Sequence, residues 1–159
     1  MRQDLDKLDR LLLAALQGDN QQTADMLADQ VGRSASAVAR RLRRLRESGA
    51  IAADVAILSD RAAGCPLSAI VHIQLERHAP QDGDRLRRRL IASPNVQLCL
   101  DISGAFDILL LVVAPDMAAY NDFADQMLAE HTAARRFETS FVKKRVKATL
   151  AFPLAGAEP

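Results

Sequence analysis

The apolar positions in the first third of the chain recur at helical spacing. A first helix is predicted by one stripe at i, i+3, i+7 and i+11, which holds Leu5, Leu8, Leu12 and Leu16. The pattern ends at Gly18-Asp19-Asn20, a cluster of turn-forming residues. A second helix is predicted to begin after Thr23 as N-cap and to bury one face, made of Ala24, Leu27, Ala28 and Val31.

Only Gly32-Arg33-Ser34 separates this second helix from a third. Ser34 is well placed to cap the third helix, and Ser48-Gly49 marks its end. Its buried face carries Val38, Leu42 and Leu45. Two helices joined by so short a turn form a helix-turn-helix, in which the second helix is positioned in the DNA major groove.

After Gly49 the apolar period changes from that of helices to that of strands. Ile51–Leu58 alternates loosely and predicts a strand, and Asp60–Pro66 is the best linker candidate. The remaining chain predicts, in order, a strand at Ser68–Leu75, a helix at Pro80–Ser93, strands at Val96–Ile102 and Ile108–Val113, a helix capped by Asp116, and a long strand at Phe137–Phe152.

The order βαββαβ predicts a ferredoxin-like sandwich, with two helices packed on one face of an antiparallel sheet. The fold class is therefore α+β. The predicted limits are a winged helix-turn-helix with a hinge strand at 1–60, a linker at 61–67 and the sandwich at 68–155. The uncovered sheet face is predicted to carry Val71, Ile73, Leu109 or their neighbours, and therefore to be buried against a second copy of the chain.

The distribution of charge along the chain indicates that the third helix binds DNA. Six arginines and no acidic residue lie between Gly32 and Arg46, whereas the rest of the chain holds 15 basic and 20 acidic residues. The overall charge of +1 therefore hides one cationic helix on a mildly acidic protein. Such a concentrated basic element is typical of surfaces that bind DNA phosphates. The alternative is a set of arginines that only solubilise an exposed helix.

Composition excludes several other classes. The longest strongly apolar run, Ile108–Ala114, is too short to span a bilayer, and Met1 is not followed by a secretory signal. Cys65 and Cys99 indicate free thiols in a reducing cytoplasm. No metal site is expected, because none of the histidines has a ligand partner at helical spacing: His72, His78 and His131. No cofactor is expected.

Four segments together resemble the Lrp/AsnC family of feast/famine transcriptional regulators. They are LDKLDRLLLAALQ, LADQVGRSASAVARRLRRLRESGAI, SGAFDILLLVVAPDMAAY and TSFVKKRVKATLAFPL, in this order. The resemblance implies a winged helix-turn-helix joined by a hinge strand to a regulatory domain. It also implies dimers paired through their sheets and assembled into tetramers or octamers, an amino-acid-like effector, and a cytoplasmic, nucleoid-associated protein of bacteria or archaea.

The third helix supplies the expected DNA contacts. Positions near the N-terminus of a recognition helix reach base edges, so Ser36, Ala37 and Arg40 are the predicted base-contacting residues. The other predicted contacts, to phosphates or near the turn, are Arg33, Ser34, Arg41, Arg43, Arg44 and Arg46. A second basic cluster, Arg85 with Arg87–Arg89, is interpreted as a solvated helix face, although DNA wrapped on a larger assembly could touch it.

The turn GAFD is the expected centre of the effector site. Asp107 opens an apolar strand, where a carboxylate is costly unless it meets a cation or N–H donors, and an amino acid would bring an ammonium group. The resemblance implies that this turn lines the site at a subunit interface. The candidates so transferred are Gly104, Phe106, Asp107, Met117, Thr139, Ser140 and Phe141. The alternative makes Asp107 a turn partner, Met117 a core residue and the others ordinary strand residues.

Two features depart from the family pattern near this site. Ala105 stands where the family has an acidic residue, and HTAARRFE stands where it has Pro-Gly-Val. The identity of the effector therefore cannot be transferred from the family.

An enzyme is the alternative function class. Sirohaem decarboxylases resemble the same two-domain architecture, but they would need His and Arg side chains in the region that here has the sequence CLDISGAFDILLLV. This region has neither, and the basic helix that such enzymes tend to lose is kept. The sequence therefore predicts a regulator and no catalytic residues.

Overall fold

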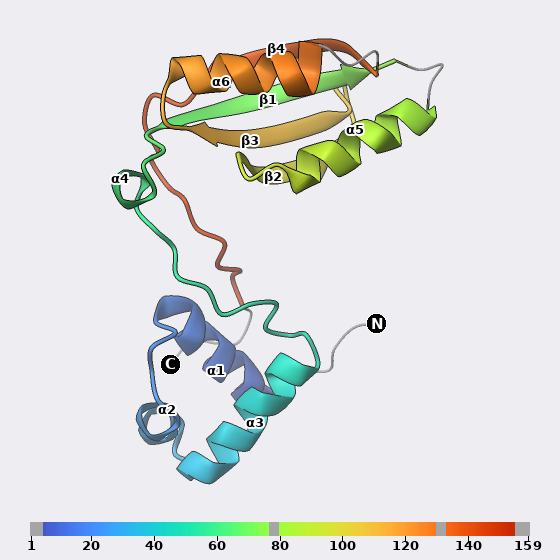
Figure 1. Ribbon diagram of the computed structural model, residues 1–159. Coiled ribbons are helices and arrows are strands. Elements are labelled where there is room, and N and C mark those ends of the chain that lie inside the picture. Colours follow the sequence, from blue (N-terminus) through green and yellow to red (C-terminus); the bar gives the residue numbers. More distant parts are fainter. Residues whose placement is uncertain (1–4, 77–79, 130–132, 155–159) are drawn as a thin grey trace. The chain divides into compact units, whose positions relative to one another are not determined.

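The computed structural model describes residues 5–76, 80–129 and 133–154 (Figure 1). These residues form two compact units. The helical unit contains the residues up to Ala56 together with those from Lys147 onward, and the sheet unit contains Ile57–Val146. The chain therefore passes from the helical unit to the sheet unit and back again. The domain limits 1–60, 61–67 and 68–155 stay predictions, and residue 155 lies outside the described ranges.

The helical unit consists of α1 (Lys7–Gly18), α2 (Ala24–Val31) and α3 (Ala35–Glu47). The predicted caps of α2 and α3 are confirmed, since the Thr23 hydroxyl accepts a hydrogen bond from the Met26 N–H and the Ser34 hydroxyl accepts one from the Ala37 N–H. Such caps satisfy backbone donors that have no partner within the helix. All three predicted helices are therefore present.

One aliphatic cluster holds these helices together. Leu12 of α1, Leu27 of α2, and Val38 and Leu45 of α3 are almost completely inaccessible to solvent. Each fully buried side chain of this size contributes about 1.5–3 kcal/mol of hydrophobic stabilisation. Gly32 lies between α2 and α3 with a φ of +62°, a left-handed conformation in which glycine has no steric penalty. The buried leucines and this turn fix the direction in which α3 leaves α2.

The sheet unit follows the predicted order. It contains β1 (Leu67–Leu75), α5 (Pro80–Ala92), β2 (Val96–Asp101), β3 (Ile108–Ala114), α6 (Met117–Ala124), the π-helix η1 (Asp125–Ala129) and β4 (Ala134–Phe141). The strands lie in the order β2-β3-β1-β4, and every neighbouring pair is antiparallel. The predicted α+β fold with a ferredoxin-like sandwich is confirmed.

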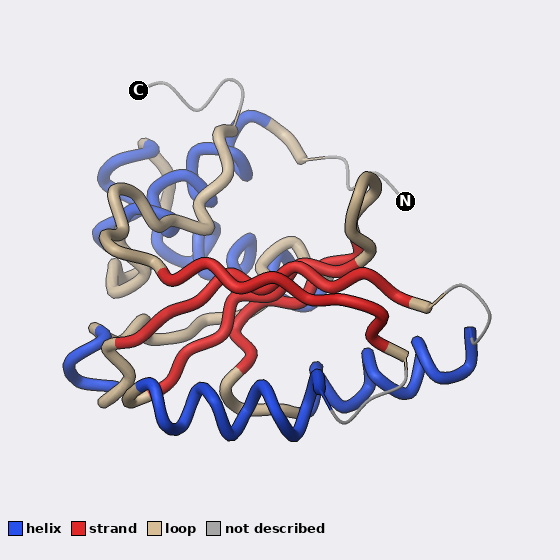
Figure 2. The backbone as a smooth tube through the Cα atoms, turned by 90° about the horizontal axis from the view of Figure 1, so that it is seen from above, coloured by secondary structure: helices blue, strands red, loops and turns tan. Residues whose placement is uncertain are grey.

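Helices α5 and α6 lie along the same face of the sheet (Figure 2). Leu86 and Leu90 of α5 and Phe123 of α6 pack there against the strands. Val71 and Ile73 are fully buried in this same cluster, so the prediction that they lie on the uncovered face was wrong. Alternation along a strand defines two faces but does not determine which face the helices cover.

The open face of the sheet carries the residues that alternate with the buried ones along each strand. The strand register places Leu109 beside His72 and Leu100, and Leu111 beside Ile70 and Leu98. Leu98 and Leu100 are 39% and 44% exposed. The expectation of an apolar open face is therefore met by Leu109 and its neighbours.

Two predicted strands differ from the structure. Ile51–Leu58 contains no strand, and its side chains Val55, Ile57 and Leu58 are exposed because no described strand pairs with this segment. β4 ends at Phe141 rather than at Phe152, since the ladder with β1 runs out there. The predicted linker contains a four-residue helix, α4 (Asp60–Ala63), capped by the Ser59 hydroxyl.

Candidate DNA-contacting helix and effector-binding residues

The outward face of α3 is polar and cationic. Ser36, Arg40 and Arg43 are spaced four and three residues apart, so they share the face opposite to Val38, Leu42 and Leu45. All three are exposed. Arg40 and Arg43 make no ion pair with any acidic residue in the described ranges. This face can therefore present two uncompensated guanidinium groups to a polyanion.

Two other arginines of α3 are held by acidic residues at the start of α1. Arg41 Nη1 lies 2.6 Å from Asp6 Oδ2 and 2.9 Å from Asp9 Oδ1, and Arg44 Nη2 lies 2.5 Å from Asp9 Oδ2. The Asp9 side chain is only 1% exposed. We call these four residues the acidic clamp. Arg41 and Arg44 were predicted to contact DNA, and the structure places both guanidinium groups against carboxylates of the same chain.

The two acids of the clamp also begin α1. Asp6 is the N-cap, its side chain accepts a hydrogen bond from the Asp9 N–H at 2.7 Å, and the Asp9 carboxylate accepts one from the Asp6 N–H at 3.3 Å. Carboxylates are favourable at a helix N-terminus because the backbone N–H groups point toward them. The Asp9 backbone N–H and the Arg41 guanidinium lower the pKa of Asp6. The sequence motif LDKLD therefore serves both a helix cap and an interhelical ion-pair cluster.

The other predicted DNA-contacting residues lie at the two ends of α3. Arg33 is exposed in the turn, where its guanidinium donates to the Gly32 carbonyl oxygen at 3.3 Å. Ser34 caps α3 and its hydroxyl lies 3.3 Å from that of Ser36. Ala37 is half-buried in the first turn. At the other end, Arg46 forms an ion pair with Asp54 at 2.8 Å. Of the predicted arginines, Arg33, Arg40 and Arg43 keep their charge without an acidic partner in the described ranges.

The first group of predicted effector residues lies at the β2–β3 turn. Asp107 is exposed, and its Oδ2 accepts a hydrogen bond from the Leu75 N–H at 2.7 Å, which ties the turn to the end of β1. The Phe106 ring lies 5.3 Å from the His72 ring and 6.0 Å from the Arg136 guanidinium carbon. Gly104 has a φ of +147°. The carboxylate therefore has a structural partner and still faces solvent.

The second group surrounds Tyr120 of α6. The Tyr120 and Thr139 hydroxyls share a hydrogen bond of 2.5 Å, and the Tyr120 and Phe141 rings pack edge to face at 5.1 Å. Burial raises the pKa of Tyr120, and the hydrogen bond to Thr139 opposes this in part. Met117 on α6 is 46% exposed. Tyr120 was not predicted, although it is the only tyrosine of the sequence and stands three residues after the predicted Met117.

The structure does not bring these two groups together within one chain. The backbone N–H of Asp107 bonds to the Ile73 carbonyl oxygen, whereas Phe141 pairs with Ala69 at the other end of β1. Four residues of extended strand span about 13 Å. Ser140 pairs with Ile70 and faces the open side of the sheet, away from Thr139.

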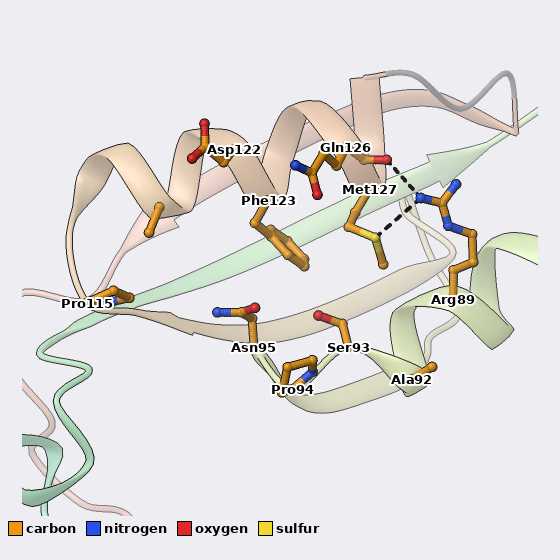
Figure 3. A pocket seen from close by; sticks show the side chains of 11 residues that line it. Arg89, Ala92, Ser93, Pro94, Asn95, Pro115, Asp122, Phe123, Gln126 and Met127 are labelled. Carbon is orange, nitrogen blue, oxygen red and sulfur yellow. Dashed lines mark hydrogen bonds between the residues drawn. The ribbon is translucent and has the colours of Figure 1, made fainter.

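A separate groove lies between the end of α5 and the α6–η1 helix (Figure 3). Its volume is about 660 Å³, within the range of small-molecule sites. Ser93 and Asn95 point toward Phe123 and Met127 across it, and Arg89 donates to the Gln126 carbonyl oxygen and approaches the Met127 sulfur. None of the predicted effector residues lines this groove.

The second basic cluster has acidic neighbours. Arg87 lies 2.8 Å from Asp101 and 3.3 Å from Asp84, and Arg85 lies 3.8 Å from Asp82. These pairs fit the interpretation of this helix face as a solvated surface.

No group of three or more His, Cys, Asp or Glu side chains within the described ranges could hold a metal ion, and His78 and His131 lie outside those ranges. In the same part of the chain, no helix has the length and apolar character needed to cross a membrane.

Both parts of the chain match models of known protein families. Residues 5–52 match a model described as winged helix-turn-helix DNA-binding. Residues 68–152 match one described as the Lrp/AsnC ligand binding domain.

Relatives match this chain over nearly its whole length. The HTH-type transcriptional regulator y4tD of Sinorhizobium fredii is 40% identical over 151 residues, which are 95% of this chain and 89% of that protein. The crystal structure of an AsnC family transcriptional regulator from Agrobacterium tumefaciens is 32% identical, with a TM-score of 0.87 over 94% of this chain and 97% of that one. A transcriptional regulator from Neisseria meningitidis, solved as a complex with L-Met, is 29% identical, with a TM-score of 0.86 over 95% and 97% of the two chains.

Proposed function

The chain belongs to the Lrp/AsnC family of transcriptional regulators, and from this premise we propose which residues bind DNA and which bind the effector. The protein is a DNA-binding regulator and not an enzyme, so the decarboxylase alternative no longer applies.

The DNA-contacting face is that of Ser36, Arg40 and Arg43 on α3. One observation carries this assignment: these exposed side chains share one helix face, and neither arginine is paired with an acid in the described ranges. Ser36, Ala37 and Arg40, near the N-terminus of α3, contact base edges, whereas Arg33 and Arg43 bind phosphates. The N-terminus of a recognition helix is the part that approaches the bases in this motif.

The effector is an amino acid or a related metabolite. This proposal is supported by the match to a ligand binding domain and by the related N. meningitidis regulator, whose structure contains L-Met. Asp107 has a solvent-facing carboxylate that can accept hydrogen bonds from an ammonium group. Because Asp107 and Phe141 lie at opposite ends of β1, a site that uses both groups requires a second copy of the chain.

The second copy docks on the open face of the sheet. Leu98, Leu100, Leu109 and Leu111 form a contiguous apolar surface there, and an apolar surface rimmed by polar residues is typical of an interface between subunits. A two-fold pairing buries the same surface on both chains. Tetramers or octamers would then form from these dimers.

Selection of DNA from a random-sequence pool tests the proposed function. The full-length protein is expected to enrich one motif with two-fold symmetry, because a dimer presents two copies of α3. The selected duplex is then titrated with the protein in the presence of each of the twenty amino acids. Failure to enrich any motif would contradict the DNA assignment, and a titration that no amino acid changes would contradict the effector assignment.

A further inference from the structure

The acidic clamp lies directly beside the DNA-contacting face of α3. Its two carboxylates, Asp6 and Asp9, face two of the six arginines of the basic run. The four side chains are two carboxylates and two guanidinium groups, so their formal charges sum to zero. Two arginines that the sequence would count as phosphate ligands therefore add no net charge at this position.

Burial makes the clamp difficult to open. The Asp9 side chain is 1% exposed, and both of its oxygens accept hydrogen bonds from guanidinium groups. A buried carboxylate that loses its cationic partners carries a large desolvation penalty. Transfer of Arg41 or Arg44 to a DNA phosphate would impose that penalty on Asp9. We therefore expect Arg41 and Arg44 to keep their ion pairs with the carboxylates of Asp6 and Asp9 when DNA is bound.

The clamp also fixes the rotation of α3. Arg41 and Arg44 lie on the side of α3 between its buried face and its outward face, and both are tied to the first turn of α1. Bidentate and multiple charge-assisted hydrogen bonds restrict geometry more than a single contact does. The angle at which Ser36 and Arg40 face the bases is therefore set in part by α1.

We propose that Asp9, assisted by Asp6, is a positioning and specificity-determining residue for DNA binding, because it holds Arg41 and Arg44 away from phosphates and fixes the orientation of α3. The role rests on the proposed function, since it requires α3 to be the DNA-contacting helix. Phosphate contacts strengthen binding to every sequence, whereas base contacts distinguish sequences. Because Arg41 and Arg44 are held away from phosphates, the affinity of the protein for DNA of any sequence is lower, and its preference for the sequence that Ser36 and Arg40 contact is preserved.

The variant Asp9→Asn tests this role because it removes the charge with almost no change in shape. Fluorescence anisotropy of the full-length protein would be measured on two duplexes of equal length: one selected by the wild type from a random pool, and a scrambled version of it. The released Arg44 is expected to raise the affinity for the scrambled duplex and to lower the ratio of selected to scrambled affinity about threefold. With one added phosphate contact, at Arg44, the log–log salt dependence becomes steeper by about 0.9, or about threefold more affinity lost between about 50 and 200 mM salt, since Arg41 keeps its ion pair with Asp6.

The control is Asp29→Asn on α2. Asp29 is exposed and makes no ion pair in the part of the chain that the structure describes, so its substitution removes the same charge without releasing an arginine. Its salt dependence is expected to equal that of the wild type. A merely structural defect would weaken binding to both duplexes, whereas the proposed role strengthens binding to the scrambled one.

Asp6→Asn is the second variant if Asp9→Asn fails to fold. Asn is as good an N-cap as Asp, so α1 keeps its cap while Arg41 loses one partner. The same changes are expected, but smaller. The role of the clamp is overturned if neither variant steepens the salt dependence, or if Asp29→Asn steepens it equally. If the wild type itself does not prefer the selected duplex, it is the proposed function that fails.

Discussion

The side chain of Gln17 and the backbone of Phe152 exchange two hydrogen bonds within the helical unit. The Gln17 amide nitrogen donates to the Phe152 carbonyl oxygen at 3.0 Å, and the Phe152 N–H donates to the Gln17 amide oxygen at 2.6 Å. Leu154 packs near the same helix cluster. The Gln17 side chain at the end of α1 thus satisfies both the N–H and the carbonyl oxygen of Phe152, as a paired strand would, and so holds the C-terminal segment in the helical unit.

Gln17→Ala is expected to loosen this attachment. Both hydrogen bonds are exposed and neutral, so their loss should cost about 1 kcal/mol of local stability. Hydrogen exchange of the backbone amides of Ala151, Phe152 and Leu154 measures the change, because it reports local opening. Gln21→Ala is the control, since the Gln21 side chain makes no hydrogen bond in the described ranges. Equal exchange rates in wild type and Gln17→Ala would contradict the attachment.

Arg40→Ala and Arg43→Ala are expected to affect DNA binding differently. Loss of a base contact at Arg40 should cost about 1–3 kcal/mol on the selected duplex and relax sequence preference, whereas loss of a phosphate contact at Arg43 should weaken all duplexes alike and lower the salt slope by about 1. Gel shifts on selected and scrambled DNA distinguish the two. If neither substitution changes affinity, α3 does not contact DNA through this face.

Leu100→Glu is expected to prevent pairing of the chain through its open sheet face. The substitution would bury a carboxylate in an apolar interface, which is costly unless the carboxylate finds a cation. Sedimentation velocity should show a smaller species than the wild type at equal concentration. Ile91→Glu adds the same charge at an apolar residue of α5 that is 70% exposed, and it should leave the assembly unchanged. If Leu100→Glu sediments as an assembly of the same size as the wild type, the interface between copies does not lie on the open sheet face.

Asp107→Asn separates the two roles of this carboxylate. An amide oxygen can still accept the Leu75 N–H, so the turn is kept while the negative charge is lost. Isothermal titration should show at least about tenfold weaker binding of the amino acid that the wild type binds, since a hydrogen bond to a charged group contributes about 1.5–3 kcal/mol. Asp122→Asn in the groove beside α6 is the comparison. If only Asp122→Asn weakens binding of the amino acid, the effector binds in the groove and not at Asp107.

The lowered pKa of Asp6 predicts how the clamp depends on pH. Because the folded-state pKa lies below the unfolded value, the ionised carboxylate stabilises the fold fully above about pH 3.9, and this stabilisation is lost as the pH falls through the lower folded value. Thermal unfolding of wild type and Asp6→Asn should therefore differ at neutral pH and converge in acid. A difference that is constant down to pH values well below about 3.9 would contradict this origin.

Local features of the fold could be predicted from the sequence, because their causes lie within a few residues. The caps Thr23, Ser34 and Asp116 act on backbone groups three residues away, and all three were predicted correctly. The predicted strand at Ile51–Leu58 failed because a strand requires a partner, which alternation alone does not supply.

The candidate site was predictable in its location but not in its contacts. The basic run indicated α3, but the pairing of Arg41 and Arg44 depends on Asp9, which lies 32 and 35 residues earlier. The partners of Asp107 and Thr139 likewise come from other elements, at Leu75 and Tyr120. Such contacts follow from tertiary packing and leave no periodic signal in the sequence.

Because the chain leaves the helical unit and later returns to it, this unit can be completed only late in synthesis. Residues from Lys147 onward belong to the helical unit, yet the ribosome makes them only after the whole of Ile57–Val146. An unfinished chain can form α1–α3 early but lacks the segment that binds Gln17. The helical unit is therefore completed only in molecules whose sheet unit, Ile57–Val146, has already been synthesised.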